Sequence, residues 1–292
     1  MARMVLLQRH RPVFALSSAD PRTAAVASGD SHGAEQPVAE MRALTMGWGG
    51  RPVLDRVDLS LWKGERLVVV GPSGAGKSTI LRLLAGLLLP SSGQLLIHGE
   101  PQRYLRLDQR HPPDVRLVFQ NPALLGSLTV RENVGFLLYR FSRLSETEIR
   151  ERVRHALEAV GLLGTEELLP GELSGGMQKR VSFARALIED PTMADGRPPL
   201  LLFDEPTAGL DPVACTRVED LIVHTTQLTH ASSVVVSHVL STIERCAEKV
   251  ILLYEGAFRW RGTLEEFRQT QNPYVRQFRS GSLQGPMQPR EL

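Results

Sequence analysis

The sequence predicts an α/β fold in which a mainly parallel sheet is covered by helices on both faces. Short, continuously apolar runs recur along the chain, as is typical of strands buried on both faces. These runs are residues 67–70, 115–119, 200–203, 233–237 and 250–254. Helical patterns separate them, as expected for parallel strands joined by crossover helices. Between about residues 121 and 185 the pattern is helical without strong strands, which predicts a helical subdomain inserted in the α/β core.

The composition is that of an ordinary globular protein of 292 residues. No stretch reaches the roughly 18 apolar residues that a membrane-spanning helix needs, so any role at a membrane would depend on a partner. The formal net charge of +2 does not indicate a nucleic-acid surface, and no nucleic-acid partner is expected. Two cysteines, Cys215 and Cys246, have neither metal nor redox spacing, which fits a reducing compartment.

Residues 1–40 differ from the rest of the chain. They are rich in Ala, Ser, Arg and Pro, lack periodicity and hold no acidic residue before Asp20. This composition predicts a disordered N-terminal extension. A transit peptide has the same bias, and a true start at Met41 is a third interpretation, so three alternatives stay open. The patterned domain then spans residues 41–270, with the helical subdomain inside it, and a tail follows at residues 271–292.

Two helices are well marked within this domain. Residues 77–89 are apolar at helical spacing and stop before Pro90. Residues 145–160 begin with a capping box formed by Ser145 and Glu148, and Gly161 stands where a C-cap belongs. A stripe of apolar residues at helical spacing predicts the buried face of this second helix.

A phosphate-binding loop follows the first apolar run. It matches the pattern G-x-x-x-x-G-K-[ST] and lies between a predicted strand and a predicted helix, which is the expected context. Its residues are Gly71, Pro72, Ser73, Gly74, Ala75, Gly76, Lys77 and Ser78, with Thr79 next to them. Glycines let the backbone curve around phosphates, and the helix start presents its positive end to an anion. We expect Lys77 to reach the β- and γ-phosphates of ATP, and Ser78 to give an oxygen to Mg²⁺.

A pair of carboxylates ends the apolar run at residues 200–203. A strand tip can hold Asp204 near a Mg²⁺ ion while Glu205 faces an attacking water. The spacing therefore predicts Asp204 as a metal ligand, usually through water, and Glu205 as the general base.

A third motif makes the resemblance to one family specific. Residues 173–177 resemble the signature motif of ATP-binding-cassette ATPases, whose usual form is Leu-Ser-Gly-Gly-Gln. They are Leu173, Ser174, Gly175, Gly176 and Met177. The resemblance spans roughly residues 41–270 and implies a P-loop NTPase core with an antiparallel β region near the N-terminus. It also implies a head-to-tail homodimer, in which the signature of one subunit completes the ATP site of the other.

Four further residues match the family's pattern one by one. Trp48 matches an aromatic residue that stacks on adenine, and Gln120 matches a glutamine that reaches Mg²⁺ and the attacking water. Asp211 matches the loop that crosses the dimer, and His238 matches a histidine that contacts the γ-phosphate. The resemblance therefore implies that Glu205, His238 and Gln120 act in catalysis.

Several strings resemble one branch, the ATPases of Mla-type lipid transporters. These strings are residues 119–134, 211–214 and 272–278 and the ending of the signature in Met177. The tail at residues 281–286 and an extra loop at Met193–Pro199 are most similar to cyanobacterial and chloroplast members. The branch implies transport of lipids such as phosphatidic acid between envelope membranes. It also implies two partners, an integral membrane permease and a lipid-carrying protein of the mammalian-cell-entry type.

The resemblance also implies a location and a docking surface. The location is the cytoplasmic face of the inner membrane, or the stromal face of a plastid inner envelope. In the family, the segment corresponding to residues 121–134 receives a short helix of the permease. We expect an exposed apolar socket there, formed by Leu124, Leu125, Leu128 and Val130; packing of these residues into the subdomain core is the alternative. The alternative functions are transport of an amino acid or a metal, or a soluble cassette ATPase without a permease.

Overall fold

The computed structural model describes residues 36–110, 112–188 and 197–288. Residues 1–35 of the predicted extension lie outside the described residues. Residues 193–196 of the predicted extra loop also lie outside them. The first strand begins at Ala39, slightly before the boundary predicted at residue 40.

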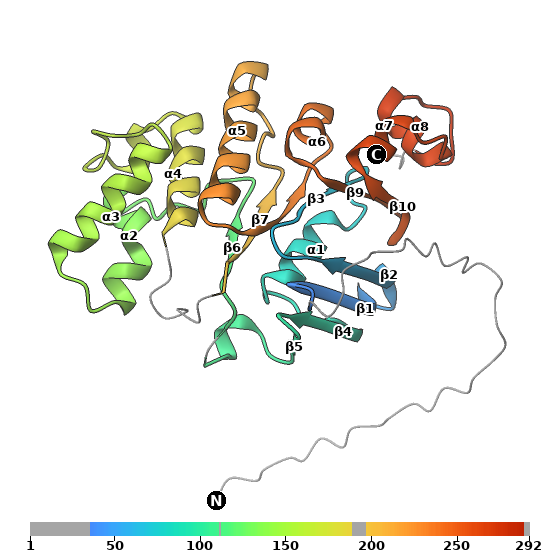
Figure 1. Cartoon of the computed structure of the whole chain (residues 1–292), viewed down its shortest axis with the longest axis horizontal. Coiled ribbons are helices and arrows are strands. Elements are labelled where there is room, and N and C mark those ends of the chain that lie inside the picture. The colour runs from blue at the N-terminus through green and yellow to red at the C-terminus, as the bar shows by residue number, and fades with distance from the viewer. Residues whose placement is uncertain (1–35, 111, 189–196, 289–292) are drawn as a thin grey trace, which may run out of the picture. The chain divides into compact units, whose positions relative to one another are not determined.

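The larger sheet has six strands in the order β10-β9-β3-β8-β7-β6 (Figure 1). Five of them run parallel, and β10 pairs antiparallel with β9 at one edge. The strands are β3 (Arg66–Val70), β6 (Val115–Val118), β7 (Leu200–Asp204), β8 (Ser232–Val236), β9 (Lys249–Tyr254) and β10 (Ala257–Thr263). The five predicted apolar runs are thus the five parallel strands, and the predicted fold class is confirmed.

A smaller antiparallel sheet has the order β2-β1-β4-β5. Its strands are β1 (Ala39–Trp48), β2 (Arg51–Leu61), β4 (Ser92–Ile97) and β5 (Glu100–Pro101). This sheet is the antiparallel β region implied by the resemblance. It packs with one face of the larger sheet and with α1 (Lys77–Leu84) in a common apolar core.

The alternation of side chains along each strand divides the larger sheet between two cores. Leu67 and Val69 of β3 face the core shared with α1 and the smaller sheet. Val68 and Val70 face a second core on the opposite side, where the remaining helices pack. Both faces are buried, which explains why the strands are continuously apolar instead of alternating with polar residues.

The remaining helices follow β6 and cover the second face (Figure 1). The α-helices are α2 (Val130–Phe141), α3 (Glu146–Ala159), α4 (Gly175–Leu187), α5 (Pro212–Leu228), α6 (Leu240–Cys246), α7 (Leu264–Gln269) and α8 (Pro273–Ser280). Two short 3-10 turns lie at Arg106–Asp108 and Pro170–Glu172. Helices α2, α3 and α4 pack on one another, in the segment where the helical subdomain was predicted.

The predicted helix ends agree with the structure at one helix and not at the other. Both bonds of the predicted capping box between Ser145 and Glu148 open α3, and Gly161 has a φ of +66° just beyond its end. The predicted helix at residues 77–89 is too long, because α1 ends at Leu84. Gly86 turns the chain with a φ of +68°, and this conformation ends a helix whatever apolar residues follow it.

Candidate nucleotide-binding and catalytic site

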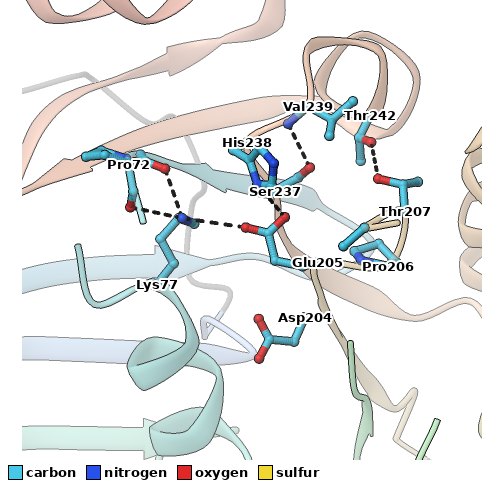
Figure 2. Close-up of polar contacts among 12 residues, drawn as sticks. Pro72, Lys77, Asp204, Glu205, Pro206, Thr207, Ser237, His238, Val239 and Thr242 are labelled. Carbon is cyan, nitrogen blue, oxygen red and sulfur yellow. Dashed lines mark hydrogen bonds and ion pairs between the residues drawn. The ribbon is translucent and has the colours of Figure 1, made fainter. Parts of the chain in front are cut away.

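Three of the predicted segments meet at the carboxyl edge of the larger sheet. The phosphate loop follows β3, the carboxylate pair ends β7, and His238 lies just after β8. Strands β3, β8 and β7 are neighbours in the sheet, so parallel pairing brings their carboxyl ends together. Figure 2 shows Lys77, Asp204, Glu205 and His238 gathered at this edge. In open α/β sheets, ligands bind outside the carboxyl ends of the strands.

The glycines at both ends of the phosphate loop are required by packing as well as by conformation. Gly71 has a φ of +152°, and a Cβ there would lie 2.2 Å from the carbonyl oxygen of Leu253 in β9. Gly76 has a φ of +104°, and a Cβ there would lie 3.0 Å from both Cγ1 and the carbonyl oxygen of Val53 in β2. The loop is thus held between the two sheets, and α1 begins directly after it.

Lys77 opens α1 and folds back over the loop. Its Nζ donates to the carbonyl of Gly71 at 2.9 Å and to that of Pro72 at 3.1 Å, and it lies 3.6 Å from Glu205 Oε1 (Figure 2). Burial lowers the pKa of the Lys77 amine, and the nearby charges of Glu205 and Asp204 oppose this shift. A cation is therefore held between the loop and the β7 carboxylates, where a phosphate bound in the loop would meet it.

Ser78 and Asp204 form a pair of oxygen atoms beside Lys77. Ser78 Oγ donates to Asp204 Oδ1 at 2.8 Å. Burial raises the pKa of the Asp204 carboxyl; the hydrogen bond from Ser78 opposes the shift, and the charge of Glu205 adds to it. A hydroxyl and a carboxylate are hard oxygen donors of the kind that Mg²⁺ takes, and Mg²⁺ is usually held by one or two carboxylates together with phosphates.

Glu205 is held in an unusual backbone conformation and contacts His238. Its φ is +44°, and its amide donates to the carbonyl of Val236 at 3.0 Å. Glu205 Oε2 lies 2.9 Å from His238 Nδ1. The Glu205 side chain is mostly buried, whereas that of His238 is more than half exposed. A non-glycine residue in the left-handed region costs of order 1–3 kcal/mol and persists where surrounding contacts enforce it.

The predicted signature motif lies at the start of α4. Ser174 is the N-cap, and its Oγ accepts from the amide of Met177 at 3.2 Å. Ser174 and Gly175 are exposed, whereas Leu173 is buried. The motif thus presents an exposed hydroxyl and a helix N-terminus, two features that can bind an anion.

Trp48, Gln120 and Asp211 lie outside the group around Lys77. Trp48 ends β1 with half of its side chain exposed, across a hairpin from the start of β2, whose Val53 packs on Gly76. Gln120 is exposed in the turn after β6, which neighbours β7. Asp211 is the N-cap of α5, where its Oδ1 accepts from the amides two and three residues later, both at 3.0 Å. The structure therefore gives Asp211 a capping role in addition to its predicted place in a loop across the dimer.

Sequence reasoning missed a lysine that holds the loop after Glu205. Lys179 in α4 is buried, and its Nζ donates to the carbonyls of Pro206 at 3.1 Å and Ala208 at 2.7 Å. Burial lowers the pKa of this amine, and the neighbouring Cys215 opposes the shift. Lysine is scarce in this arginine-rich chain, and this scarcity is a signal that could have singled out Lys179.

The described residues contain neither a cluster of three or more metal-binding side chains nor a helix long and apolar enough to cross a membrane. A Mg²⁺ site formed by Ser78 and Asp204 with phosphate oxygens needs no such cluster.

Comparisons with known proteins give one consistent result. Residues 54–208 match the family model described as ABC transporter. The chloroplastic protein TRIGALACTOSYLDIACYLGLYCEROL 3 of Arabidopsis thaliana is 48% identical over 258 residues, which cover 85% of this chain and 75% of that protein. The intermembrane phospholipid transport system ATP-binding protein MlaF of Haemophilus influenzae is 36% identical over 256 residues, covering 86% of this chain and 94% of that protein.

Solved structures agree with the sequence comparisons. The cbiO1 protein from Clostridium perfringens, part of the ABC transporter complex cbiONQ, has a TM-score of 0.70 at 28% identity and covers 82% of this chain and 93% of its own. A dimeric ATP-binding cassette in a post-hydrolysis state, bound to ADP and Pi, has a TM-score of 0.65 at 28% identity and covers 77% of this chain and 98% of its own.

Proposed function

This chain belongs to the ABC transporter family and is an ATPase, and we propose that it is the ATP-hydrolysing subunit of a transporter that moves phospholipid between membranes. The predicted family resemblance is confirmed. The proposed cargo rests on the similarity to MlaF, which belongs to an intermembrane phospholipid transport system. The match covers 94% of the length of MlaF. The site's geometry supports the following division of roles.

The phosphate loop and Lys77 bind the nucleotide. The glycine-rich backbone of the loop and the positive end of α1 would receive the phosphates, and Lys77 would place its amine against the β- and γ-phosphates. Trp48 is proposed to stack on adenine, because its exposed ring lies on the hairpin that packs against Gly76. The Nζ bonds to the Gly71 and Pro72 carbonyls hold the lysine over the loop, where phosphate oxygens can replace these two acceptors.

Ser78 and Asp204 are the proposed Mg²⁺ ligands, with Gln120 as a third group from the turn after β6. The Ser78–Asp204 pair fits the ion because both are hard oxygen donors 2.8 Å apart beside the phosphate loop. When bound, Mg²⁺ neutralises charge on the β- and γ-phosphates. The raised pKa of Asp204 indicates a site in which the carboxylate is better accommodated when a cation accompanies it.

Glu205 is the proposed general base and His238 its partner at the γ-phosphate. Glu205 Oε1 lies 3.6 Å from Lys77 Nζ, and Oε2 lies 2.9 Å from His238 Nδ1. The carboxylate is therefore positioned between the cation that meets the γ-phosphate and the exposed imidazole. From there it can accept a proton from a water aligned with the phosphorus, while Lys77 and His238 stabilise the charge that spreads over the phosphate oxygens.

Ser174 of one subunit is proposed to complete the ATP site of a second copy in a head-to-tail homodimer. Its hydroxyl and the exposed start of α4 form an anion-binding surface in the helical subdomain. The dimeric cassette bound to ADP and Pi supports this arrangement by analogy. Leu173, Gly175, Gly176 and Met177 shape the same surface, and Asp211 lies at the loop that would cross the dimer.

The subunit is proposed to attach to an integral membrane permease, and through it to act with a lipid-carrying protein of the mammalian-cell-entry type. This places it at the cytoplasmic face of the inner membrane, or at the stromal face of a plastid inner envelope, where ATP is supplied. The permease contact is proposed at the segment between Gln120 and α2, which Asn133 holds on the helix. Asn133 Oδ1 accepts from the amide of Leu125 at 2.7 Å, and its Nδ2 donates to the carbonyls of Leu125 and Leu128 at 3.0 and 2.9 Å.

The predicted apolar socket needs one correction. Val130 is fully buried, because it opens α2 and packs in the subdomain core, so it cannot contact a partner. Leu124 also packs partly against that core. Leu125 stays 46% exposed, and Phe119 and Phe136 nearby in the sequence are exposed aromatic residues. The proposed permease contact is therefore centred on Leu125.

The catalytic proposal is tested with Glu205→Gln. The variant should bind ATP as wild type does, lose nearly all turnover because the water has no base, and accumulate an ATP-bound dimer. The matched control is Glu255→Gln, since Glu255 also follows a strand of the same sheet with a positive φ of +49° but is exposed and lies 3.8 Å from Arg259. Near wild-type hydrolysis by Glu205→Gln would show that the base has been assigned wrongly.

The transport proposal is tested with Leu125→Asp. ATP hydrolysis by the isolated subunit should be unchanged, whereas recovery of the permease from detergent extracts should fall, because an unpaired carboxylate is costly to bury in an interface. Leu163→Asp is the control, since Leu163 is equally exposed elsewhere on the helical subdomain. Undiminished permease binding would place the contact elsewhere. Recovery of an amino-acid or metal permease with the wild-type chain would overturn the lipid assignment.

A further inference from the structure

A fully buried carboxyl group lies behind the catalytic edge of the sheet, in a part of α5 that no motif covers. Glu219 has a relative exposure of 0%, the lowest of any charged residue among those the structure describes. Burying a carboxyl group is costly unless hydrogen bonds or an opposite charge compensate it. The groups that offset the cost of burying the Glu219 carboxyl therefore indicate which segments this residue holds together.

Among the described residues, its side-chain partners lie in α6, the helix that begins just after His238. Glu219 Oε1 accepts from Ser241 Oγ at 2.7 Å and from Thr242 Oγ1 at 2.9 Å. Glu219 Oε2 lies 3.2 Å from Arg245 Nε. The N-cap residue of α6 is Val239, which cannot cap the helix with its side chain. Glu219 thus attaches the first turn of α6 to α5 across the core.

The hydrogen bonds continue from α6 to the loop that follows Glu205. Thr242 Oγ1 lies 3.2 Å from Thr207 Oγ1, and both threonines are buried (Figure 2). A hydroxyl has one proton, and Thr242 directs its proton to Glu219, so Thr207 must be the donor in the second bond. The series of hydrogen bonds therefore has a fixed donor-to-acceptor direction, from Thr207 to Thr242 to Glu219. Buried hydrogen bonds that share groups strengthen one another and favour one arrangement; here Glu219 Oε1 takes both hydroxyl bonds, and Oε2 has its contact with Arg245.

This hydrogen-bond chain connects the two segments that carry the catalytic contact. Thr207 is two residues after Glu205, and Thr242 is four residues after His238. Glu205 is in the left-handed region, so its position depends on contacts that enforce this conformation. The Glu205 amide bond to the Val236 carbonyl joins the two segments at the strand ends, and the Thr207–Thr242 bond joins them a second time beyond Glu205 and His238.

We propose that Glu219 is a positioning residue for ATP hydrolysis. It acts through Thr242 and Thr207 to keep the Glu205 carboxylate in contact with the His238 imidazole. This inference rests on the proposed roles of Glu205 and His238. It adds a fully buried residue of α5 that lies outside the sequence motifs of the site. The nucleotide-binding residues 71–79 are not part of the chain of bonds, so nucleotide affinity should not depend on it.

The decisive variant is Thr242→Val in the full-length chain. Valine has the shape of threonine but neither donates nor accepts, so Thr207 loses its acceptor and Glu219 loses one donor. We expect the kcat for ATP to fall roughly fivefold to tenfold, while KM for ATP and nucleotide affinity stay at wild-type values. Thr242→Ser restores the hydroxyl and should recover most of the lost kcat.

Ser241→Ala is the matched control. It removes the other hydroxyl that donates to the same Glu219 oxygen, but it leaves the Thr207–Thr242 bond in place. A merely structural role for Glu219 predicts similar losses of stability for Ser241→Ala and Thr242→Val, without a change in the kcat of either folded protein. The positioning role predicts a lowered kcat for Thr242→Val alone.

Three results would overturn the proposal. One is a folded Thr242→Val variant with wild-type kcat, and another is equal loss of kcat in Ser241→Ala. If Thr242→Val does not fold, Thr207→Val breaks the same bond from the other side, and a wild-type kcat there is the third. Where Thr207→Val and Thr242→Val both fold, the kcat of the double variant should be no lower than that of Thr242→Val alone, because both substitutions remove the same bond.

If Glu205→Gln is inactive while Thr242→Val is fully active, the positioning role fails and the proposed function stands. If Glu205→Gln is fully active, the catalytic assignment itself fails.

Discussion

Replacing Lys179 with methionine tests whether α4 holds the loop after Glu205. Methionine keeps the length and much of the apolar stem of lysine but removes the amine, which donates to the carbonyls of Pro206 and Ala208 at 3.1 and 2.7 Å. Pro206 is buried, so its carbonyl would lose its partner where water has little access. The loop between Glu205 and α5 would then be free to shift away from α4.

The expected magnitude follows from these two bonds and from one opposing effect. Hydrogen bonds from a charged group contribute about 1.5–3 kcal/mol each. Burial lowers the pKa of Lys179, which shows that the cation itself is costly to bury, so the variant recovers part of the loss. We therefore expect the free energy of unfolding to fall by about 1–3 kcal/mol in total. For a domain of this size, Tm should fall by about 2–4 °C per kcal/mol.

The assay compares Lys179→Met with Lys63→Met, which removes the same charge at an exposed position. Unfolding by urea, nucleotide affinity and ATP turnover are measured on both variants. Lys179→Met should be less stable and slower in turnover, with nucleotide affinity unchanged because residues 71–79 are untouched. The reasoning is refuted if Lys179→Met matches Lys63→Met in both stability and kcat.

Three further perturbations give sharp expectations. Gly71→Ala should destabilise the chain by about 1–3 kcal/mol or prevent folding, measured by thermal unfolding, because its Cβ would lie 2.2 Å from the Leu253 carbonyl; wild-type stability would contradict the packing argument. Ser174→Arg should bind ATP but not dimerise or turn over, and mixing it with Lys77→Ala should restore some activity if one intact composite site suffices; full activity of Ser174→Arg alone would refute the role of Ser174 across the dimer. Asp204→Asn should lose Mg²⁺-dependent turnover yet, without Mg²⁺, be at least as stable as wild type at pH 7. Burial raises the Asp204 pKa above 3.8, so the ionised form destabilises the fold at neutral pH, and the stability difference should vanish as the pH falls toward 3.8. A wild-type chain more stable than Asp204→Asn at pH 7 would reverse that sign.

The site residues that could be predicted from the sequence are those whose role depends on local geometry. The phosphate loop, the carboxylate pair and the signature each have a spacing that determines what the backbone can present. The phosphate loop, the carboxylate pair and His238 each follow a predicted strand. Because these strands are parallel neighbours in the sheet, their carboxyl ends bring the three segments together. Ser145 and Gly161 were predictable for the same reason, because caps depend on a few adjacent residues.

The residues that could not be predicted depend on packing between distant segments. Glu219 resembles any polar residue of a surface helix until α6 covers it, and Thr242 lies 23 residues further along the chain. Val130 resembles an exposed loop residue until the N-cap at Thr129 places it on the buried side of α2. In both cases burial decides the role, and burial depends on contacts that local patterns do not encode.

The contacts of residues 205–211 connect the start of α4, near Ser174, with the site around Glu205 and His238. Lys179 binds this loop from α4, whose first residues follow Ser174, and Thr242 binds it from α6, which follows His238. Asp211 ends the loop as the N-cap of α5, the helix that also carries Glu219. In the proposed dimer, a displacement of α4 would therefore move this loop, which follows Glu205, through the bonds of Lys179. The Lys179–Pro206 and Thr207–Thr242 bonds are buried, and closely packed interiors favour transmission of a displacement between the elements that such bonds join. Closure of the proposed dimer on the Ser174 surface would then reach Glu205, the proposed general base of the same subunit, through Lys179, and the carboxyl of Glu219 would keep His238 aligned with it.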